Sequence, residues 1–161
     1  MALTHGIPAS IAGMFWPSIH DITTDPDDPP VFVALLARRG GRRVSRPEYD
    51  GPNAATEQRR AYPDIQPLTL AAPLAQVFDA AMAAARTMGW ELVAADRDAA
   101  RIEAIATTSL MRFKDDVVIR LRQEAAGIRV DVRSKSRLGR GDLGTNARRI
   151  RRFLAALTRS L

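Results

Sequence analysis

Regular alternation of side-chain character over residues 113–123 constrains the fold more than any other feature of this 161-residue sequence. Val117, Ile119 and Leu121 stand at every second position, which predicts a strand with one apolar face. Residues 127–137 alternate in the same way behind the short link EAAG, so the two segments predict a β-hairpin. A hairpin of this kind needs cover on its apolar face only.

A second hairpin is predicted directly before the first, because residues 90–95 and 101–108 flank the turn DRDA. Residues 68–70 form a further short strand, and apolar residues at a helical period predict helices over residues 73–88 and 145–158. The order β-α-β-β-β-β-α predicts an α+β two-layer sandwich of the helix-grip type, with both helices on one face of an antiparallel sheet. The polar side of the last helix carries Arg148, Arg149, Arg151 and Arg152.

Residues 1–66 predict an extended N-terminal arm that wraps a body formed by residues 67–161. The arm contains the acidic stretch HDITTDPDDPP, whose prolines favour extended backbone. Within it, residues 31–36 (VFVALL) predict a short strand and residues 54–60 a single helical turn.

Charge is unevenly distributed along the chain. Residues 1–100 hold 9 lysines and arginines against 12 acidic residues, whereas residues 101–161 hold 15 against 6. A basic half of this kind attracts an anionic partner, unless the acidic half of the chain covers it. Exposed aromatic residues, on which single-stranded nucleic acid stacks, do not interleave with the basic residues. A small anionic ligand or an anionic lipid surface is therefore favoured over nucleic acid.

The sequence gives little support for a disulfide-linked, metal-binding or membrane-spanning protein. The absence of cysteine excludes disulfides and cysteine-ligated metals, and the acidic stretch lacks the glycine and terminal glutamate of a calcium loop, so no metal or cofactor is expected. No apolar run is long enough to predict a transmembrane segment. We expect a cytoplasmic location, or a periplasmic or membrane-associated one if an N-terminal anchor is removed. The sequence is compatible with a homo-oligomer as well as with a monomer.

Strand parity predicts a strongly basic outer sheet face. This face attracts phosphate groups, or it is covered by the acidic stretch of the arm. Asp116 is expected to face outward and to pair across strands with Arg133 or Lys135. The basic residues expected on this face are Arg120, Arg122, Arg129, Arg133, Lys135 and Arg137.

The same parity turns Phe113 and Asp115 inward, together with Ser134 and Ser136, and Thr108 is expected nearby. Asp115 lies opposite Ser134 if the hairpin loop is four residues long, and opposite Ser136 in the alternative register. These polar groups either satisfy one another at a strand end or line the mouth of a pocket between sheet and helices.

The stretch SRLGRGDLGTNARR is the second candidate site. Its glycines permit tight turns before a helix whose first N–H groups carry partial positive charge, so a phosphate or carboxylate is predicted to bind there. The alternative is a capped helix in which Asp142 pairs locally. The residues of the predicted anion site are Arg137, Arg140, Gly144, Thr145 and Asn146.

Five separated stretches carry a family resemblance: IHDITTDPDDPPVF, YPDIQPL, GWELVAADRDAARIEAIATT, RFKDDVVIRLR and RVDVRSKSRLGRGDLGTNARRIRRFL. They lie in this order between residues 19 and 157, and together they resemble the domain-of-unknown-function family numbered 1499. The resemblance implies a bacterial protein, because many members look membrane-anchored or exported in bacteria, with relatives in plastids. It implies no activity, cofactor or catalytic residue. The stretch GWELVAADRDAARIEA is also similar to the helix-grip domains of a lipoprotein component of the outer-membrane barrel assembly machinery, which supports the fold.

No nucleophile with a paired base is evident in the sequence. The chain is therefore interpreted as a non-enzymatic binding or accessory domain that holds an anionic ligand or surface. The alternative is a small enzyme of unknown reaction, with a helix-grip cavity lined by Asp115 and the serines.

Overall fold

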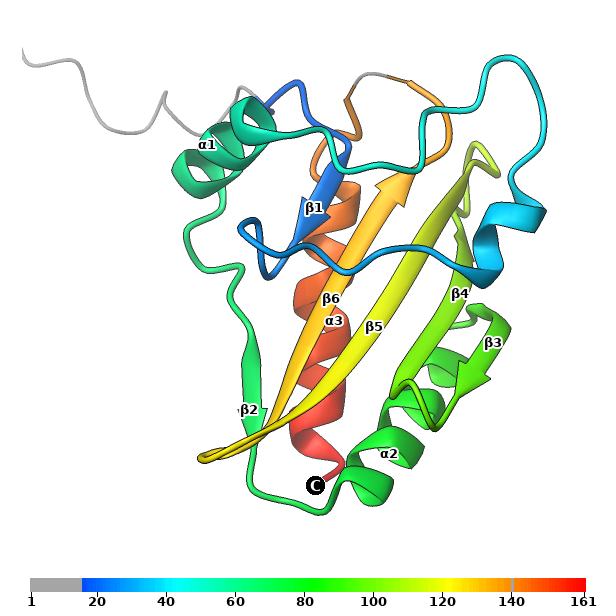
Figure 1. Cartoon of the computed structure of the whole chain (residues 1–161). Coiled ribbons are helices and arrows are strands. Elements are labelled where there is room, and N and C mark those ends of the chain that lie inside the picture. The colour runs from blue at the N-terminus through cyan, green and yellow to red at the C-terminus, as the bar shows by residue number, and fades with distance from the viewer. Residues whose placement is uncertain (1–15, 140) are drawn as a thin grey trace, which may run out of the picture.

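The computed structural model describes residues 16–139 and 141–161, which form an α+β two-layer sandwich as predicted (Figure 1). All strand pairs are antiparallel in the order β1-β6-β5-β4-β3, and β2 also pairs with β6. The strands are β1 (Asp21–Thr23), β2 (Leu68–Leu70), β3 (Glu91–Asp96), β4 (Arg101–Thr107), β5 (Lys114–Glu124) and β6 (Gly127–Ser136). The helices are α1 (Pro52–Ala61), α2 (Leu74–Thr87), α3 (Thr145–Arg159) and the 3₁₀ helix η1 (Ala34–Arg38).

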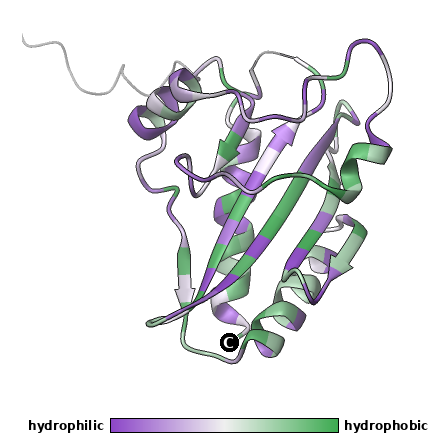
Figure 2. Cartoon of the chain, viewed as in Figure 1, coloured by the Kyte–Doolittle hydropathy of each residue, from purple (hydrophilic) through white to green (hydrophobic). Residues whose placement is uncertain are grey.

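Helices α2 and α3 cover the inner face of the sheet, where the main hydrophobic core lies (Figure 1). Val117 and Ile119 of β5 are fully buried there in one hydrophobic cluster with side chains of both helices, and the rings of Trp90 and Phe153 stack with centroids 5.3 Å apart. Hydrophilic and hydrophobic bands follow one another along β5 in Figure 2. Each large core side chain contributes about 1.5–3 kcal/mol through its burial. The apolar stripes of α2 and α3 therefore explain why both helices pack on the same face of the sheet.

The β5–β6 hairpin adopts the second of the two registers considered, with Asp115 opposite Ser136. Glu124 pairs with Gly127, so the link is two residues long rather than four. Gly127 has φ +136° and permits this tight turn. A Cβ atom at this position would lie 2.5 Å from the carbonyl oxygen of Leu70, so the glycine also lets β2 approach.

The strand expected over residues 31–36 is wrong, because η1 occupies this part of the chain. Leu35 is buried whereas Val33 is exposed. The carboxylate of Glu103, fully buried on β4, accepts the backbone N–H groups of residues 33–35 at 2.9–3.1 Å. These are the N–H groups that a helix start leaves free, and they turn the chain into a helix instead of a strand. The helical turn expected over residues 54–60 is extended to α1, which Pro52 opens.

We expect Glu103→Gln to destabilise the fold by about 2–4 kcal/mol, because an amide nitrogen would face backbone donors in a buried site. Chemical denaturation measures the change in the free energy of unfolding. Glu91→Gln on β3 is the matched control, since Glu91 pairs with Arg38 where both side chains are about half exposed, and it should cost much less. Equal losses for the two variants would contradict the capping role.

Candidate functional site

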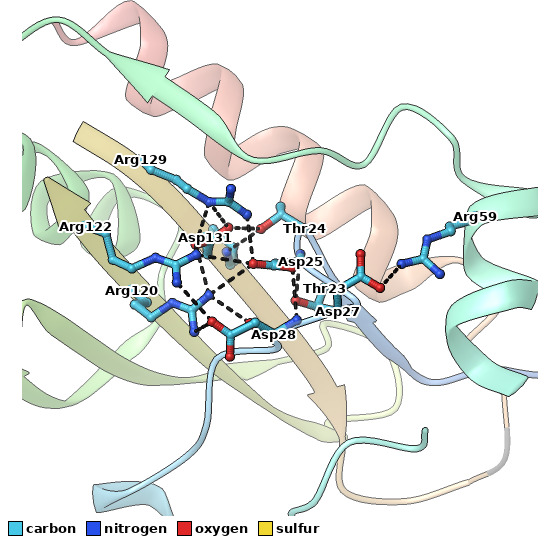
Figure 3. Close-up of polar contacts among 11 residues, drawn as sticks. Thr23, Thr24, Asp25, Asp27, Asp28, Arg59, Arg120, Arg122, Arg129 and Asp131 are labelled. Atoms are coloured by element: carbon cyan, nitrogen blue, oxygen red, sulfur yellow. Dashed lines mark hydrogen bonds and ion pairs between the residues drawn. The ribbon is translucent and has the colours of Figure 1, made fainter. Parts of the chain in front are cut away.

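Three arginines of the outer face converge on aspartates of the N-terminal acidic stretch, as Figure 3 shows. Asp25 accepts from Arg129 at 2.8 Å and from Arg122 at 3.3 Å, and Asp131 of β6 accepts from Arg120 and Arg122 at 3.1 and 3.0 Å. We call this group the arginine–aspartate cluster; its members are Asp25, Asp28, Arg120, Arg122, Arg129 and Asp131. The acidic stretch therefore lies across the basic face, which was one of the two predicted alternatives.

Further along β6, buried cations are paired with the same segment. The Arg133 guanidinium and the Lys135 ammonium both contact Asp21 of β1, at 2.8 and 3.1 Å. Lys135 also contacts Asp50 at 2.6 Å. The side chains of Asp21, Arg133 and Lys135 are at most 2% exposed, and buried charges persist only when paired in this way.

Asp116 faces outward as predicted, but its expected pairing with Arg133 or Lys135 is wrong. It lies opposite Lys135 in the register, yet its carboxylate binds Arg137 at 2.7 Å and also contacts Arg39. Asp21 already holds both expected partners, which explains the difference. The guanidinium of Arg137 therefore lies on the outer face, directed at Asp116 rather than at the turn before α3.

A hollow of about 270 Å³ lies beside the arginine–aspartate cluster, between the acidic stretch and α1. Arg59 and Arg129 line it, but the first pairs with Asp27 at 2.6 Å and the second with Asp25. The positive charges in its wall are thus matched by carboxylates in the same wall.

A second hollow, of about 150 Å³, lies where the β4–β5 turn meets the loop before α3. It brings together four residues from the two predicted sites, namely Thr108, Asp115, Ser136 and Thr145. Phe113 stands at its rim and is 44% exposed, so its predicted inward orientation is wrong. The reason is that β5 begins at Lys114, and Phe113 belongs to the turn, where the N–H of Phe113 is bonded to Thr108 Oγ1.

The floor of this hollow is a buried polar network. The guanidinium of Arg149 donates to Asp115 at 2.6 Å and to Ser134 at 3.0 Å, and Asn146 donates to Ser136 at 2.9 Å. Burial raises the pKa of the Asp115 carboxyl, and the positive charge of Arg149 opposes that rise. Ser134 donates to Asn146 at 2.6 Å and lies among these groups rather than in the lining of the hollow.

The N-terminus of α3 is capped from within the chain. The Asp142 carboxylate accepts the N–H of Gly144 at 2.8 Å and that of Asn146 at 2.7 Å, so two donors of the predicted anion site are engaged. Gly144 adopts a left-handed conformation with φ +75°, and a Cβ atom there would lie 2.5 Å from the Trp16 ring. Arg140 lies outside the described residues.

Sequence reasoning missed Arg149, which was expected on the polar side of α3 and is instead buried under the hollow. A signal was available: Arg149 stands three residues after Asn146 and four before Phe153, on the stripe that faces the sheet. Glu103 was also missed, and nothing in its strand pattern distinguishes it from an outward, solvated residue.

Two further features bear on the class of site. Within residues 16–139 and 141–161, no three or more histidine, cysteine, aspartate or glutamate residues are placed to hold a metal ion. None of the helices in the described part of the chain is long and apolar enough to cross a bilayer.

Sheet, helices and polar hollows together define a single-sheet α+β domain whose charges are largely paired inside the chain. Residues 21–157 match the model of the family described as "Protein of unknown function (DUF1499)", and the chain belongs to this family, as the resemblance predicted. A search of curated proteins finds no match to the chain.

We expect Asp25→Asn to strengthen binding to polyanions, because it removes one of the two carboxylates that Arg122 and Arg129 share and leaves their positive charges less fully balanced. It should also lower the free energy of unfolding by about 1–3 kcal/mol. The salt concentration that elutes the protein from a heparin column measures the first effect. Asp27→Asn is the control, since it removes the same charge from an exposed pair. Identical elution of the two variants would contradict the shielding role of Asp25.

Tyr49 generates a prediction at alkaline pH. Its hydroxyl is buried without a hydrogen-bond partner among the described residues, and burial raises its pKa to about 12. An unfolded tyrosine ionises near pH ~10. Between about pH 10 and about pH 12 the folded chain therefore binds more protons than the unfolded chain, and Tyr49 makes stability fall as the pH rises.

The variant Tyr49→Phe should show a shallower fall in stability over this pH interval in urea unfolding experiments. At neutral pH its stability should be equal or greater, since an unpaired buried hydroxyl is removed. A parallel fall in parent and variant, or a marked loss at neutral pH, would count against this account.

Proposed function

We propose that this chain is a non-enzymatic binding or accessory domain, helix-grip-like and bacterial, that holds an anionic ligand or surface at one end of its sheet. We define this loop end as residues 40–46, 108–114, 137–139 and 141–144. Ser45 joins the first loop to the end of β6, where the third loop begins, since its N–H and hydroxyl donate to the carbonyl oxygens of Arg137 and Ser136 at 2.7 and 2.9 Å. All three loops lie at the same end of the sheet in Figure 1.

One observation carries the proposal: five cations of the loop end are exposed and form no ion pair with a carboxylate in the described part of the chain. They are Arg42, Arg43, Arg46, Arg112 and Lys114. The outer-face arginines, in contrast, are matched by aspartates. The one acidic residue in these loop segments, Asp142, is engaged at the start of α3. An anion would therefore meet uncompensated positive charge there.

Of the residues of the predicted anion site before α3, Thr145 contributes most to the proposed site, because it lines the hollow of about 150 Å³ between the β4–β5 turn and the loop before α3. Gly144 and Asn146 are already engaged by Asp142, and Arg137 by Asp116. The charge of the proposed site therefore comes from the neighbouring loops.

A small enzyme is the alternative, and the raised pKa of Asp115 favours it, because acid–base catalysts often lie in such hollows. Two features favour the binding domain instead. The Asp115 carboxylate is held by Arg149, and Ser136 by Asn146, so the polar groups satisfy each other.

Titration with glycerol 3-phosphate, followed by backbone amide NMR, tests the proposal. Residues 108–114 and 40–46 should shift, whereas those of the β5–β6 turn should not. The variant Arg112→Gln/Lys114→Gln should bind about tenfold more weakly or worse, because a charge-assisted hydrogen bond contributes about 1.5–3 kcal/mol.

The matched control is Arg86→Gln/Arg159→Gln, which removes two exposed charges from the last turns of α2 and α3. If both double variants weakened the binding of glycerol 3-phosphate equally, the effect would come from net charge alone, and the proposed site would be overturned. Shifts confined to the hollow around Asp115, with none in the cationic loops, would favour the enzyme.

A further inference from the structure

Apolar side chains also gather at the loop end. Ten large hydrophobic residues are exposed in the described part of the chain, and five of these ten lie in the loops of the loop end. Leu110 is 88% exposed, and Met111, Leu143, Phe113 and Leu138 are 62%, 67%, 44% and 42% exposed. Scattered exposed leucines need no explanation, but a group of five at one end of a domain marks an interaction surface.

The two loops that carry these side chains are held together. Phe113 and Leu138 line the same hollow, and the N–H of Arg137 donates to the carbonyl of Lys114 at 3.1 Å. Two non-glycine residues, Arg112 and Leu143, have left-handed backbones with φ +56° and +52°. Such conformations are uncommon and are kept where the surrounding structure fixes the loop.

Hydrogen bonds across its base hold the β4–β5 turn in shape. Thr108 donates its N–H to the carbonyl of Phe113 at 2.8 Å, and its own carbonyl and hydroxyl accept the N–H groups of Arg112 and Phe113 at 3.1 and 2.9 Å. These bonds fix the base of the turn, and Leu110 and Met111 stand at its exposed tip. The tip can therefore reach the polar boundary of a bilayer, where water still meets the backbone, with its two apolar side chains foremost.

Cations surround the apolar group. Arg112 and Lys114 stand in the same turn as Leu110 and Met111, and Arg42 and Arg43 are exposed on the adjacent loop. On the other flank, the Arg148 guanidinium lies 5.4 Å from the ring of Trp16, which is 51% exposed. Apolar tips within a rim of cations, with a tryptophan beside them, match the interfacial zone of an anionic bilayer.

We propose that the loop end docks on an anionic lipid bilayer, with Leu110 and Met111 entering the headgroup–acyl boundary and the basic loops contacting lipid phosphates. This inference rests on the proposed function and specifies its anionic partner. A nucleic acid would use the cations but not the leucines and methionine. Phe113 is the one aromatic residue in these loop segments, whereas single-strand binding needs several stacking rings.

Co-sedimentation of the full chain with vesicles tests the inference. Vesicles of three parts phosphatidylcholine to one part phosphatidylglycerol should bind the protein, pure phosphatidylcholine should not, and added salt should weaken binding. Each basic residue at an anionic surface strengthens binding by about fivefold. Arg112→Gln/Lys114→Gln should therefore weaken vesicle binding by roughly an order of magnitude or more.

The variant Leu110→Ser/Met111→Ser separates insertion from charge. It should lose most vesicle binding while its affinity for glycerol 3-phosphate stays unchanged. Both side chains are largely exposed, so the fold should survive, which thermal unfolding would verify. Val31→Ser/Leu36→Ser is the matched control, since it removes two exposed apolar side chains outside the loop end and should bind like the parent.

The outcomes distinguish the two proposals. Binding of glycerol 3-phosphate without binding of anionic vesicles overturns the bilayer inference and leaves the proposed function standing. Failure with both ligands overturns both. Vesicle binding that survives Leu110→Ser/Met111→Ser, equal binding to neutral vesicles, or tighter binding to a single-stranded oligonucleotide than to anionic vesicles also overturns the bilayer inference.

Discussion

The contact of Asp21 with Arg133 and Lys135 is the interaction on which the rest of the structure depends. Two cations are buried in the middle of the sheet, and without a carboxylate they would remain uncompensated at a cost of several kcal/mol. Asp21 meets this requirement by adding β1 to the edge of β6. Once β1 is fixed, the following residues can reach the arginine–aspartate cluster, and η1 can reach Glu103. The basic face thus determines where residues 21–38 lie.

Two adjacent carboxylates at the start of β5 connect both layers of the domain. Asp115 faces inward and binds Arg149 of α3, while Asp116 faces outward and binds Arg137 and Arg39. Both are buried, so each needs its partner. The first residues of β5 therefore join the helix on one face and the N-terminal segment on the other. This double connection supports the loops that carry the proposed anion site.

Alternation and helical period were enough to predict the sheet, the helices α2 and α3, and the inner position of Asp115, because these depend on local sequence patterns. The approach of the acidic stretch to the basic face was one of two interpretations left open, since charge complementarity does not specify geometry. The partners of Asp116 could not be predicted, because Asp21 competes for Arg133 and Lys135 from a distant part of the chain. Nor could η1, whose start is capped by Glu103, about 70 residues later.

The separation in sequence between β1 and its partner bears on the order of folding. The contact of Asp21 with Arg133 spans 112 residues, whereas the β5–β6 hairpin closes across two. Hairpins form quickly, and contacts between distant residues form late because long loops must close first. The four-stranded part of the sheet would then exist for a time with its arginines bare, before the acidic segment arrives. During that interval a polyanion competes with the chain's own aspartates, so its presence would slow the final docking step.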